Sequence, residues 1–302
     1  MNTPVVFVIF NRPATTRRVL ERIRRARPST LLVIADGPRP GHRRDTALCR
    51  EARHLVTSGV DWPCELITCF SERNLGRDSR VVSGLNWAFA RVERAIVLED
   101  DCLPDDSFFR FCHQLLERYR DDARVMSISG TNCLPDVKKR ACSYSFSRIP
   151  FIWGWATWRR AWRCYNAQLR QTGVDGLLRE HFGQWPDVYQ YAATALSMCR
   201  GQEPLSWSHF WAFSAMEKNG FHVVPGRNLL SNIGFSPDAS FTRDPDSELA
   251  NLPAQRLRFP LRHPARHVSN KRADRDTLRV LIRHISVSNA PRGFPSGAMT
   301  RG

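Results

Sequence analysis

Three consecutive acids, Glu99, Asp100 and Asp101, follow the apolar run Ala95–Leu98 and carry the clearest chemical signal in the chain. Neighbouring carboxylates repel one another unless a cation lies close by. Mg²⁺ and Mn²⁺ prefer carboxylate and phosphate oxygens, and they commonly take one or two protein carboxylates beside a substrate phosphate. We therefore expect the triplet to hold Mn²⁺ or Mg²⁺ against a diphosphate and to neutralise that group as it departs. The alternative is a solvated loop before a helix N-terminus, where acids are also favoured.

Two other apolar runs end in polar residues that suit a phosphate or a nucleotide. Asn11 and Arg12 follow Val5–Phe10, and Asp36 follows Leu31–Ala35. An arginine pairs with a phosphate, and an aspartate accepts a hydrogen bond from a ribose or a base. Each residue also has a plainer interpretation, because Asn and Asp-Gly are frequent in turns.

A cluster of tryptophans marks the second half of the chain. Seven of the nine Trp residues lie between positions 153 and 211, and Trp153-Gly154-Trp155 opens the cluster. Aromatic rings with a polar edge suit sugar faces, which favours a sugar contact centred on Trp153 and Trp155. Trp155, Trp158 and Trp162 recur at helical spacing, and tryptophans in such a pattern can equally form the core of the protein.

These residues need a scaffold, and the first 130 positions supply one in which short apolar strands alternate with helices. Such alternation predicts an α/β fold with a mostly parallel, Rossmann-like sheet covered by helices on both faces. Ligands bind beyond the carboxyl ends of the strands in these sheets, so the three polar clusters should meet at one rim. We expect strands at Val5–Phe10, Leu31–Ala35, Cys64–Phe70, Ala95–Leu98 and Val125–Ser129, and helices from Pro13 and at Arg44–Ser58, Asp78–Arg91 and Ser107–Tyr119.

The pattern changes after about residue 140. We expect helices near Thr157–Cys164, Asp187–Cys199 and Ser208–Asn219, a strand at Phe221–Val224, and irregular chain over Asn228–Thr242. From Pro253 onward 11 Lys and Arg stand against two Asp, and one helix is expected near Leu278–Ile285.

The formal net charge is +16 and comes mostly from arginine. This charge predicts attraction to nucleic acid, anionic lipid or phosphorylated substrates, although an arginine-rich solvated surface would give the same value. Nine Cys without a C-x-x-C pair favour reduced thiols over a disulfide framework or a zinc site. We see no signal peptide and no apolar run of about 18 residues, and so expect a cytoplasmic protein, with peripheral contact to the inner face of the membrane through its basic surface.

Taken together and in order, seven segments resemble the GT-A glycosyltransferases, and in particular bacterial family-2-like glycosyltransferases, sometimes described as hemolytic-protein-like. The layout is also similar to that of N-acetylglucosaminyltransferase I. The resemblance covers roughly residues 3 to 243 and is carried by Phe10–Pro13, Ile34–Gly37, Asn74–Gly76, Val97–Asp101, Ile152–Trp155, Trp207–Trp211 and Ser231–Phe235.

The resemblance implies a nucleotide-diphosphate-sugar donor, UDP-linked, with Mn²⁺ as the usual metal. It implies that Asp101 ligates the metal, that Asp100 faces the ribose and that Glu99 faces the sugar. The acceptor would be a glycan, polysaccharide or lipid-linked glycan, and transfer would be inverting. Nucleotide contacts would come from Phe10, Asn11, Arg12 and Asp36, and sugar or acceptor contacts from Trp153, Gly154 and Trp155.

On this interpretation residues 1–243 form the glycosyltransferase domain, with a nucleotide-binding half at 1–130 and a sugar and acceptor half at 131–243. Residues 244–302 form a basic C-terminal extension. These boundaries follow the extent of the resemblance, and the basic composition from Pro253 onward marks the extension.

Two departures from the family pattern bear on activity. Relatives tend to carry an acid where this chain has Ser208, and such an acid would deprotonate the acceptor hydroxyl. Relatives also tend to carry a His, a candidate metal ligand, where this chain has Phe241. The neighbouring His209 has a suitable ordinary pKa for the base, although it can equally be a structural histidine between two tryptophans.

Three other functions remain as alternatives. The departures at Ser208 and Phe241 suggest a GT-A-like protein that binds a sugar nucleotide with reduced or lost transferase activity. The charge suggests a basic nucleic-acid-binding protein, but no helix-turn-helix, RRM or zinc pattern supports nucleic acid as the partner. A nucleotidyltransferase would need a Gly-rich loop with Lys or Arg after the first strand, and Asn11-Arg12-Pro13 does not fit.

Overall fold

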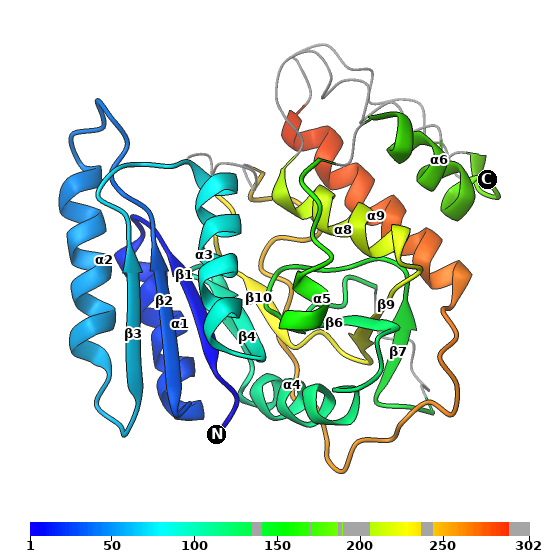
Figure 1. The fold of residues 1–302 in the computed structure, drawn as a ribbon, viewed down its shortest axis with the longest axis horizontal. Helices are drawn as coiled ribbons and strands as arrows, with labels where there is room; N and C mark the ends of the chain where they lie inside the picture. The colour runs from blue at the N-terminus through cyan, green and yellow to red at the C-terminus, as the bar shows by residue number, and fades with distance from the viewer. Residues whose placement is uncertain (135–140, 169–170, 187–188, 190–205, 237–243, 290–302) are drawn as a thin grey trace.

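The computed structural model describes the chain apart from residues 135–140, 169–170, 187–188, 190–205, 237–243 and 290–302 (Figure 1). The described residues form an eight-stranded sheet and a separate two-stranded sheet. From one edge to the other the large sheet runs β3 (Glu65–Phe70), β2 (Thr30–Ala35), β1 (Val5–Ile9), β4 (Arg94–Glu99), β8 (Trp155–Trp158), β6 (Val125–Ser129), β9 (Phe221–Pro225) and β7 (Tyr144–Ser147).

Six of these eight strands point the same way. β1 is parallel to β2 and β4, and β2 is parallel to β3. β8 is antiparallel to both β4 and β6, so β6 runs in the same direction as β4. β9 is parallel to β6, and β7 is antiparallel to β9. The predicted α/β fold with a mostly parallel sheet is therefore confirmed, with β8 and β7 as the reversed strands.

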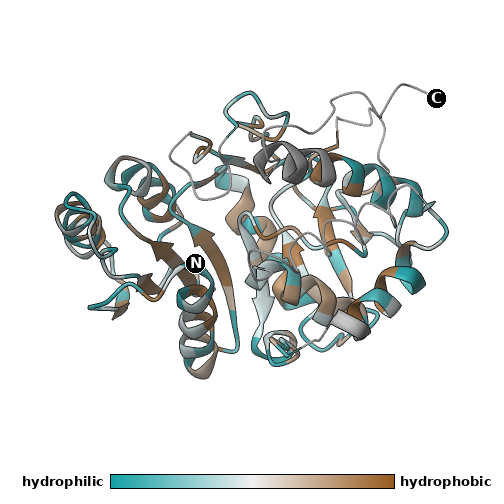
Figure 2. Ribbon diagram, turned by 90° about the horizontal axis from the view of Figure 1, so that it is seen from above, coloured by the Kyte–Doolittle hydropathy of each residue, from teal (hydrophilic) through white to brown (hydrophobic). Residues whose placement is uncertain are grey.

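Helices cover both faces of the sheet, because side chains alternate between the faces along each strand. Val5, Phe7 and Ile9 of β1 pack with α1 (Pro13–Ala26), α2 (Asp45–Gly59) and α4 (Asp106–Arg118). Val6 and its neighbours in β2 pack with α3 (Arg77–Arg91), α5 (Arg159–Trp162) and α8 (Trp207–Glu217). Figure 2 shows the hydrophobic residues concentrated along the strands between these two layers.

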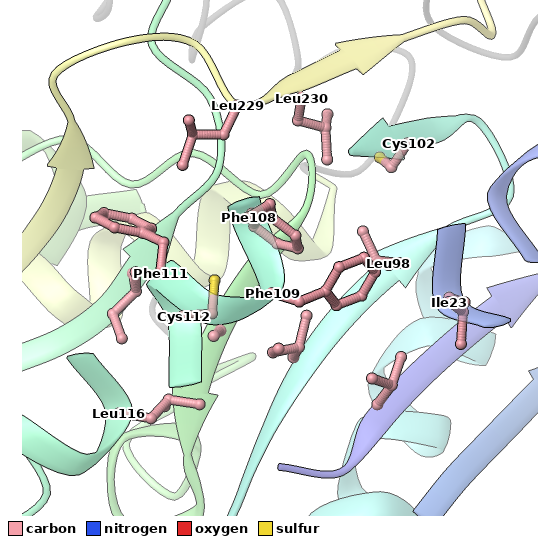
Figure 3. Packing of buried hydrophobic residues seen from close by; sticks show 14 of the residues in the cluster. Ile23, Leu98, Cys102, Phe108, Phe109, Phe111, Cys112, Leu116, Leu229 and Leu230 are labelled. Carbon is pink, nitrogen blue, oxygen red and sulfur yellow. The ribbon is translucent and has the colours of Figure 1, made fainter. Parts of the chain in front are cut away.

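The small sheet and α4 close the rim of the large sheet near the end of β4. β5 (Cys102–Pro104) pairs antiparallel with β10 (Leu230–Asn232). Phe109 of α4 packs against Leu98 of β4, and Phe108 and Leu230 belong to the same core cluster (Figure 3). The turn after the acid triplet is thus held on an apolar base.

Several predictions for the second half are corrected. The helix expected from Thr157 begins only at Arg159, because Trp155–Trp158 is a buried strand between β4 and β6. The segment expected to be irregular contains β10. The helix at Ser208–Asn219 and the strand at Phe221–Val224 are confirmed as α8 and β9. The helix expected at Asp187–Cys199 falls on residues of which only Tyr189 is described.

The C-terminal extension packs against the body through buried Leu249, Leu257, Leu261 and Val280. Its expected helix is present as α9 (Lys271–Asn289), which begins before the predicted Leu278. Asp274 of α9 accepts hydrogen bonds from the Ser147 hydroxyl and from the Arg148 backbone N–H. The remaining helix, α6 (Gln171–Phe182), contacts α8. Across the described residues, no helix combines the length and apolar character that crossing a bilayer requires.

Candidate functional site

The acid triplet lies where β4 ends, beside the end of β1. Glu99 is paired in register with Val8 of β1. The backbone N–H of Phe10 donates to Asp100 Oδ2 at 3.0 Å, which fixes that carboxylate against the first βα turn. The cap of α4 is Asp105, whose carboxylate accepts from Ser107 N at 2.8 Å. The triplet is therefore not needed to cap α4, so helix capping does not explain why its three residues are acidic.

Arg12 and Asp101 come together from positions 89 residues apart in the sequence. The Arg12 Nη1 atom lies 2.9 Å from Asp101 Oδ2, and the two side chains are 32% and 15% exposed. Both lie at the carboxyl ends of neighbouring parallel strands, as expected for this rim of the sheet. Both side chains are therefore accessible enough for a ligand to reach them.

The triplet concentrates negative charge. Burial, together with the charges of Asp101 and Asp100, raises the pKa of Glu99. Burial and the charge of Asp101 also raise the pKa of Asp100, and the nearby guanidinium of Arg12 only partly offsets this. A cation at this position would stabilise the ionised carboxylates and relieve their repulsion.

The donor atoms at the triplet fit a hard divalent cation held largely by substrate oxygens. Asp101 Oδ1 contacts the Cys102 thiol, a weak donor, at 3.6 Å. Within the described part of the chain, no group of three or more His, Cys, Asp or Glu side chains is arranged to hold a metal. A metal here would therefore rely on one or two carboxylates together with phosphate oxygens, which is common for Mg²⁺.

Segment 232–234 packs directly on Asp101. The Ile233 N–H donates to the backbone carbonyl of Asp101 at 2.8 Å. A Cβ added to Gly234 would lie 2.7 Å from Asp101 Cγ, so only glycine allows this approach. Asn232 Oδ1 accepts from Gly234 N at 2.9 Å and shapes the turn. Phe241, the second departure from the family pattern, lies outside the described residues.

Asp36 is buried at the end of β2, and its carboxylate is hydrogen-bonded to other residues of the protein. Its carboxylate accepts hydrogen bonds from Gly37 N and Leu75 N, each at 2.9 Å, and from Asn74 Nδ2 at 3.1 Å. These bonds tie the loop before α3 to the end of β2. The turn interpretation thus describes Asp36 in this structure, and its role as a nucleotide contact stays a prediction.

Asn11 also has a partner within the protein. Its Nδ2 donates to Asp45 Oδ1 at 2.8 Å, and Asp45 is paired with Arg39, whose Nε lies 2.6 Å from Asp45 Oδ2. The Arg39 guanidinium lies 5.6 Å from the centre of the Phe10 ring. Asn11 and Phe10 therefore border the rim, and Asn11 helps to fix the start of α2.

The structure corrects the interpretation of Trp155 as an exposed sugar contact. Trp155 is 1% exposed and lies within an aromatic cluster, with its ring centre 5.6 Å from that of Trp211. Trp153 is half-buried and packs edge-on against Phe235 at 5.8 Å. Gly154 has a φ of +56°, and a Cβ there would overlap the Leu230 side chain. Of the three, Trp153 alone keeps accessible surface, because strand pairing turns Trp155 into the core.

The start of α8 holds Ser208 and His209. The Ser208 hydroxyl lies 2.6 Å from the Ser206 hydroxyl, and His209 Nδ1 lies 3.3 Å from the same Ser206 oxygen. Burial lowers the pKa of His209, and the charge of Arg77 lowers it further. His209 is therefore neutral at neutral pH and retains a lone pair for a proton.

Asp78 is a candidate site residue that the sequence interpretation missed. Asp78 Oδ1 accepts from the Trp207 N–H at 3.0 Å, so a carboxylate from α3 lies at the first turn of α8. The charge of Arg77, the first residue of α3, lowers the pKa of both Glu99 and His209. The only signal for this in the sequence was the loop before α3, and nothing in it indicated a contact with residue 207.

No model of a known protein family matches the chain, and no curated protein matches it. Comparison with solved structures gives remote similarities. The apo form of mouse xyloside xylosyltransferase 1 is 14% identical, covers 74% of this chain and 85% of its own, and gives a TM-score of 0.39. Residues 1–349 of TarS from S. aureus are 8% identical, with coverage of 72% and 71% and a TM-score of 0.38.

A UDP-glucose pyrophosphorylase in complex with UDP-glucose is 12% identical over 42% of this chain, with a TM-score of 0.27. The match spans 56% of that protein, a little over half its length. These neighbours include a sugar transferase and a nucleotide-sugar enzyme by name, but similarity at this level assigns no reaction to the chain. The chain's own residues have to support any assignment.

Proposed function

We propose that this protein is a metal-dependent GT-A-type glycosyltransferase that uses a nucleotide-diphosphate-sugar, UDP-linked, as donor. The observation that supports this most is the acid triplet at the end of β4, where Asp101 already attracts a cationic partner, Arg12, at 2.9 Å. The burial and mutual repulsion that raise the pKa of Glu99 and Asp100 favour a bound cation there.

Residues at the rim divide the binding of such a donor between them. Asp101 would hold Mn²⁺ or Mg²⁺, which when bound neutralises the diphosphate as the sugar leaves. Arg12, which is paired with Asp101 in this structure, would pair with a phosphate oxygen of the donor once Asp101 holds the metal. Asp100, held by the Phe10 N–H, faces the nucleoside side, and Glu99 faces the sugar. Asn11 and Asp36 hold the two loops that frame the nucleotide.

The acceptor side lies at the start of α8. An inverting displacement needs a base that takes the proton of the attacking hydroxyl. His209 is neutral because burial lowers its pKa, so it can accept that proton where Ser208 cannot. Asp78, bonded to the first turn of α8, supplies a nearby negative charge that favours the protonated imidazole. The acceptor is proposed to be a glycan, a polysaccharide or a lipid-linked glycan.

A second candidate is a protein that binds the sugar nucleotide but does not transfer it. Ser208 favours this candidate, because its hydroxyl is bonded to Ser206 and it brings no carboxylate to the turn. The substitution His209→Gln separates the two functions. If the protein is an active transferase, the native form turns over the donor, and His209→Gln loses this turnover but keeps donor binding. If it is a non-transferring protein, the native form already shows neither transfer nor hydrolysis of the donor.

The experiment that tests the proposed function is a thermal-shift panel of nucleotide sugars with and without Mn²⁺. The proposal predicts stabilisation by one nucleotide class only when the metal is present. Stabilisation follows from mass action when a ligand binds the folded state alone. If no nucleotide sugar raises the melting temperature, with Mn²⁺ or without it, both candidates are excluded.

A further inference from the structure

Residues 253–267 form an extended segment, here called the basic strap, that runs along the surface beside α4 (Figure 1). Its side chains alternate between the core and the solvent. Leu257 and Leu261 are buried and Phe259 is half-buried, whereas Arg256, Arg258 and Arg262 are exposed. Arg256 and Arg258 are two residues apart, so in extended chain they lie on one side, about 7 Å from each other.

The strap and α4 enclose a groove of about 750 Å³. Arg110, Gln114 and Arg118 line it from one face of α4, and Phe259 and His263 line it from the strap. Arg110 and Arg118 are eight residues apart on a helix, which separates them by about 12 Å along the groove. The Arg110 guanidinium lies 4.2 Å from the centre of the Phe259 ring and is held in place there.

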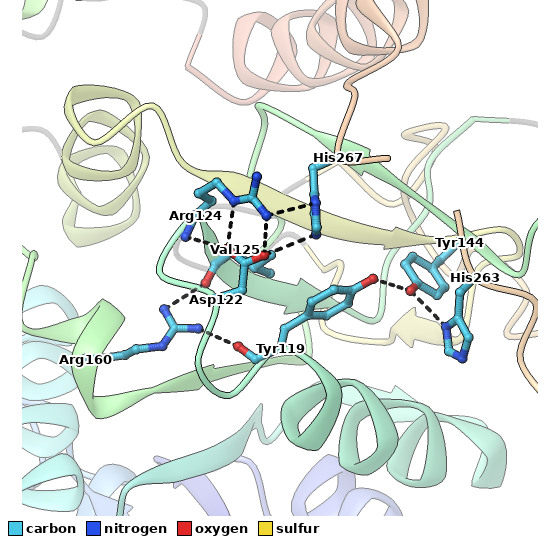
Figure 4. A network of polar contacts seen from close by, with 8 residues as sticks. All are labelled: Tyr119, Asp122, Arg124, Val125, Tyr144, Arg160, His263 and His267. Carbon is cyan, nitrogen blue, oxygen red and sulfur yellow. Dashed lines mark hydrogen bonds and ion pairs between the residues drawn. The ribbon is translucent and has the colours of Figure 1, made fainter. Parts of the chain in front are cut away.

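The strap is fixed rather than loosely attached. Its Leu257 N–H donates to the Ser107 hydroxyl at 2.9 Å, and its Arg262 N–H donates to the Ser143 hydroxyl at 2.9 Å. His263 Nδ1 lies 3.0 Å from the Tyr144 hydroxyl, which also contacts the Tyr119 hydroxyl (Figure 4). The groove is therefore formed before any ligand arrives, which lowers the entropic cost of binding.

The groove is separate from the acid triplet. α4 begins just after the triplet, and its last turn lies at the other end of β4, because Glu117 forms an ion pair with Arg94. Arg94 is the first residue of β4 and Glu99 is the last. The groove thus extends from near the rim toward the opposite edge of the sheet.

The groove is strongly positive. Residues 253–270 contain four Arg and two His and no acid. The one acid of the groove wall, Glu117, is paired with Arg94. Arg110 and Arg118 make the α4 wall of the groove cationic, whereas the strap wall consists of Phe259, Pro260, Leu261 and His263. The exposed Arg256, Arg258 and Arg262 add positive charge along the strap beside the groove. Such a surface attracts polyanions and holds them along its length.

We propose that this groove binds a linear anionic glycan, one that carries carboxylate or phosphate groups. A concave groove with Arg110 and Arg118 spaced along one wall fits one extended anionic chain better than a flat membrane. A single-stranded nucleic acid would use exposed aromatic rings as stacking platforms. The Phe259 ring that lines the groove is half-buried and has the Arg110 guanidinium 4.2 Å from its centre, which makes it a poor stacking platform. The choice of a glycan as the polyanion rests on the proposed function.

The test is fluorescence anisotropy of a labelled polygalacturonate oligomer with the full chain, without nucleotide or metal. The groove variant Arg110→Gln/Arg118→Gln removes the two arginines of the α4 wall. The control variant Arg43→Gln/Arg50→Gln removes two exposed arginines near and within α2. We expect about ten-fold weaker binding for the groove variant and less than about two-fold for the control, because only the first pair contacts the ligand.

Equal losses of glycan binding in the two variants would show that binding depends only on the net charge of the protein, and would overturn the proposal. Tighter binding of an oligouridylate of matched charge, or of vesicles with phosphatidylglycerol, would assign the groove to nucleic acid or to membrane instead. The nucleotide-sugar thermal shift is measured on the same variants. If the groove variant loses glycan binding and keeps donor stabilisation, the groove proposal is supported independently of the donor site. If neither variant loses glycan binding and both keep donor stabilisation, the groove proposal fails and the proposed donor site is unaffected.

Discussion

The guanidinium of Arg12 lies 2.9 Å from the carboxylate of Asp101 and joins the first βα turn to the end of β4. In the absence of a ligand each side chain satisfies the charge of the other. A divalent cation at Asp101 would compete with Arg12 and release it toward an anion. On the proposed function, the pair would couple the binding of a metal to the binding of a diphosphate.

Replacing Arg12 should weaken donor binding more than it destabilises the fold. Arg12→Gln should raise the Kd of the nucleotide sugar about ten-fold, or about 1.4 kcal/mol, because a charge-assisted phosphate contact is lost. Isothermal titration with Mn²⁺ present measures this. Arg17→Gln, an exposed arginine on α1, is the control and should leave the Kd unchanged. Equal affinities for the Arg12 variant and the native protein would remove Arg12 from the donor site.

Gly234 should tolerate no side chain. In Gly234→Ala the new Cβ would lie 2.7 Å from Asp101 Cγ. We expect a loss of about 1–3 kcal/mol in the free energy of unfolding from this overpacking, together with a weaker metal-dependent shift. The control is Gly176→Ala on α6, where a Cβ meets nothing within 4 Å and alanine should be neutral or stabilising. Urea unfolding of both variants decides the matter, and an unchanged Gly234→Ala protein would contradict the packing described.

The Arg39–Asp45 pair should make stability depend on acid. The bond from Arg39 lowers the pKa of Asp45 to about 2, from an ordinary 3.8. A carboxyl whose pKa is lowered by folding contributes stability that is complete above the unfolded pKa, near 4, and is lost as the pH falls through about 2. Asp45→Asn should therefore cost about 2 kcal/mol at pH 7 and much less near pH 2. Urea unfolding at both pH values measures the difference, and an equal cost at both would refute the linkage.

Trp155 should matter for stability rather than for sugar binding. It is 1% exposed, so Trp155→Ala should cost about 3–5 kcal/mol in the free energy of unfolding. Trp87→Ala, at a half-buried tryptophan on α3, should cost less. Trp155→Phe should fold and keep its affinity for the donor sugar. Loss of that affinity in a well-folded Trp155→Phe protein would restore the sugar-contact interpretation.

Much of the first half could be predicted because it repeats one local rule. β1, β2 and β4 are short apolar runs buried on both faces, and the first two end in the turn signals Asn11-Arg12-Pro13 and Asp36-Gly37. β3, at the edge of the sheet, is only partly buried. The rule that polar residues after parallel strands share a rim brought Arg12 and Asp101 together correctly. No long-range information was needed for that step beyond the direction of the strands.

The second half depends on pairings that are remote in sequence. Trp155–Trp158 looks helical from its spacing, but hydrogen bonds to β4 and β6 on either side make it a strand. β10 is only three residues long and exists because β5 pairs with it. The contact of Asp78 with Trp207 joins two helix starts 129 residues apart, and neither local sequence indicates the other.

The most direct test of the central claim is the melting temperature of Asp101→Asn in the presence of Mn²⁺ and UDP-sugars. The matched control is Asp106→Asn, an exposed aspartate five positions further along the chain. The account predicts that the native protein and the Asp106 variant are stabilised by nucleotide and metal together, by about 3 kcal/mol at a ligand concentration of 100 Kd. It predicts that Asp101→Asn folds and loses this stabilisation. Full metal-dependent stabilisation of the Asp101 variant would contradict a donor site at the acid triplet.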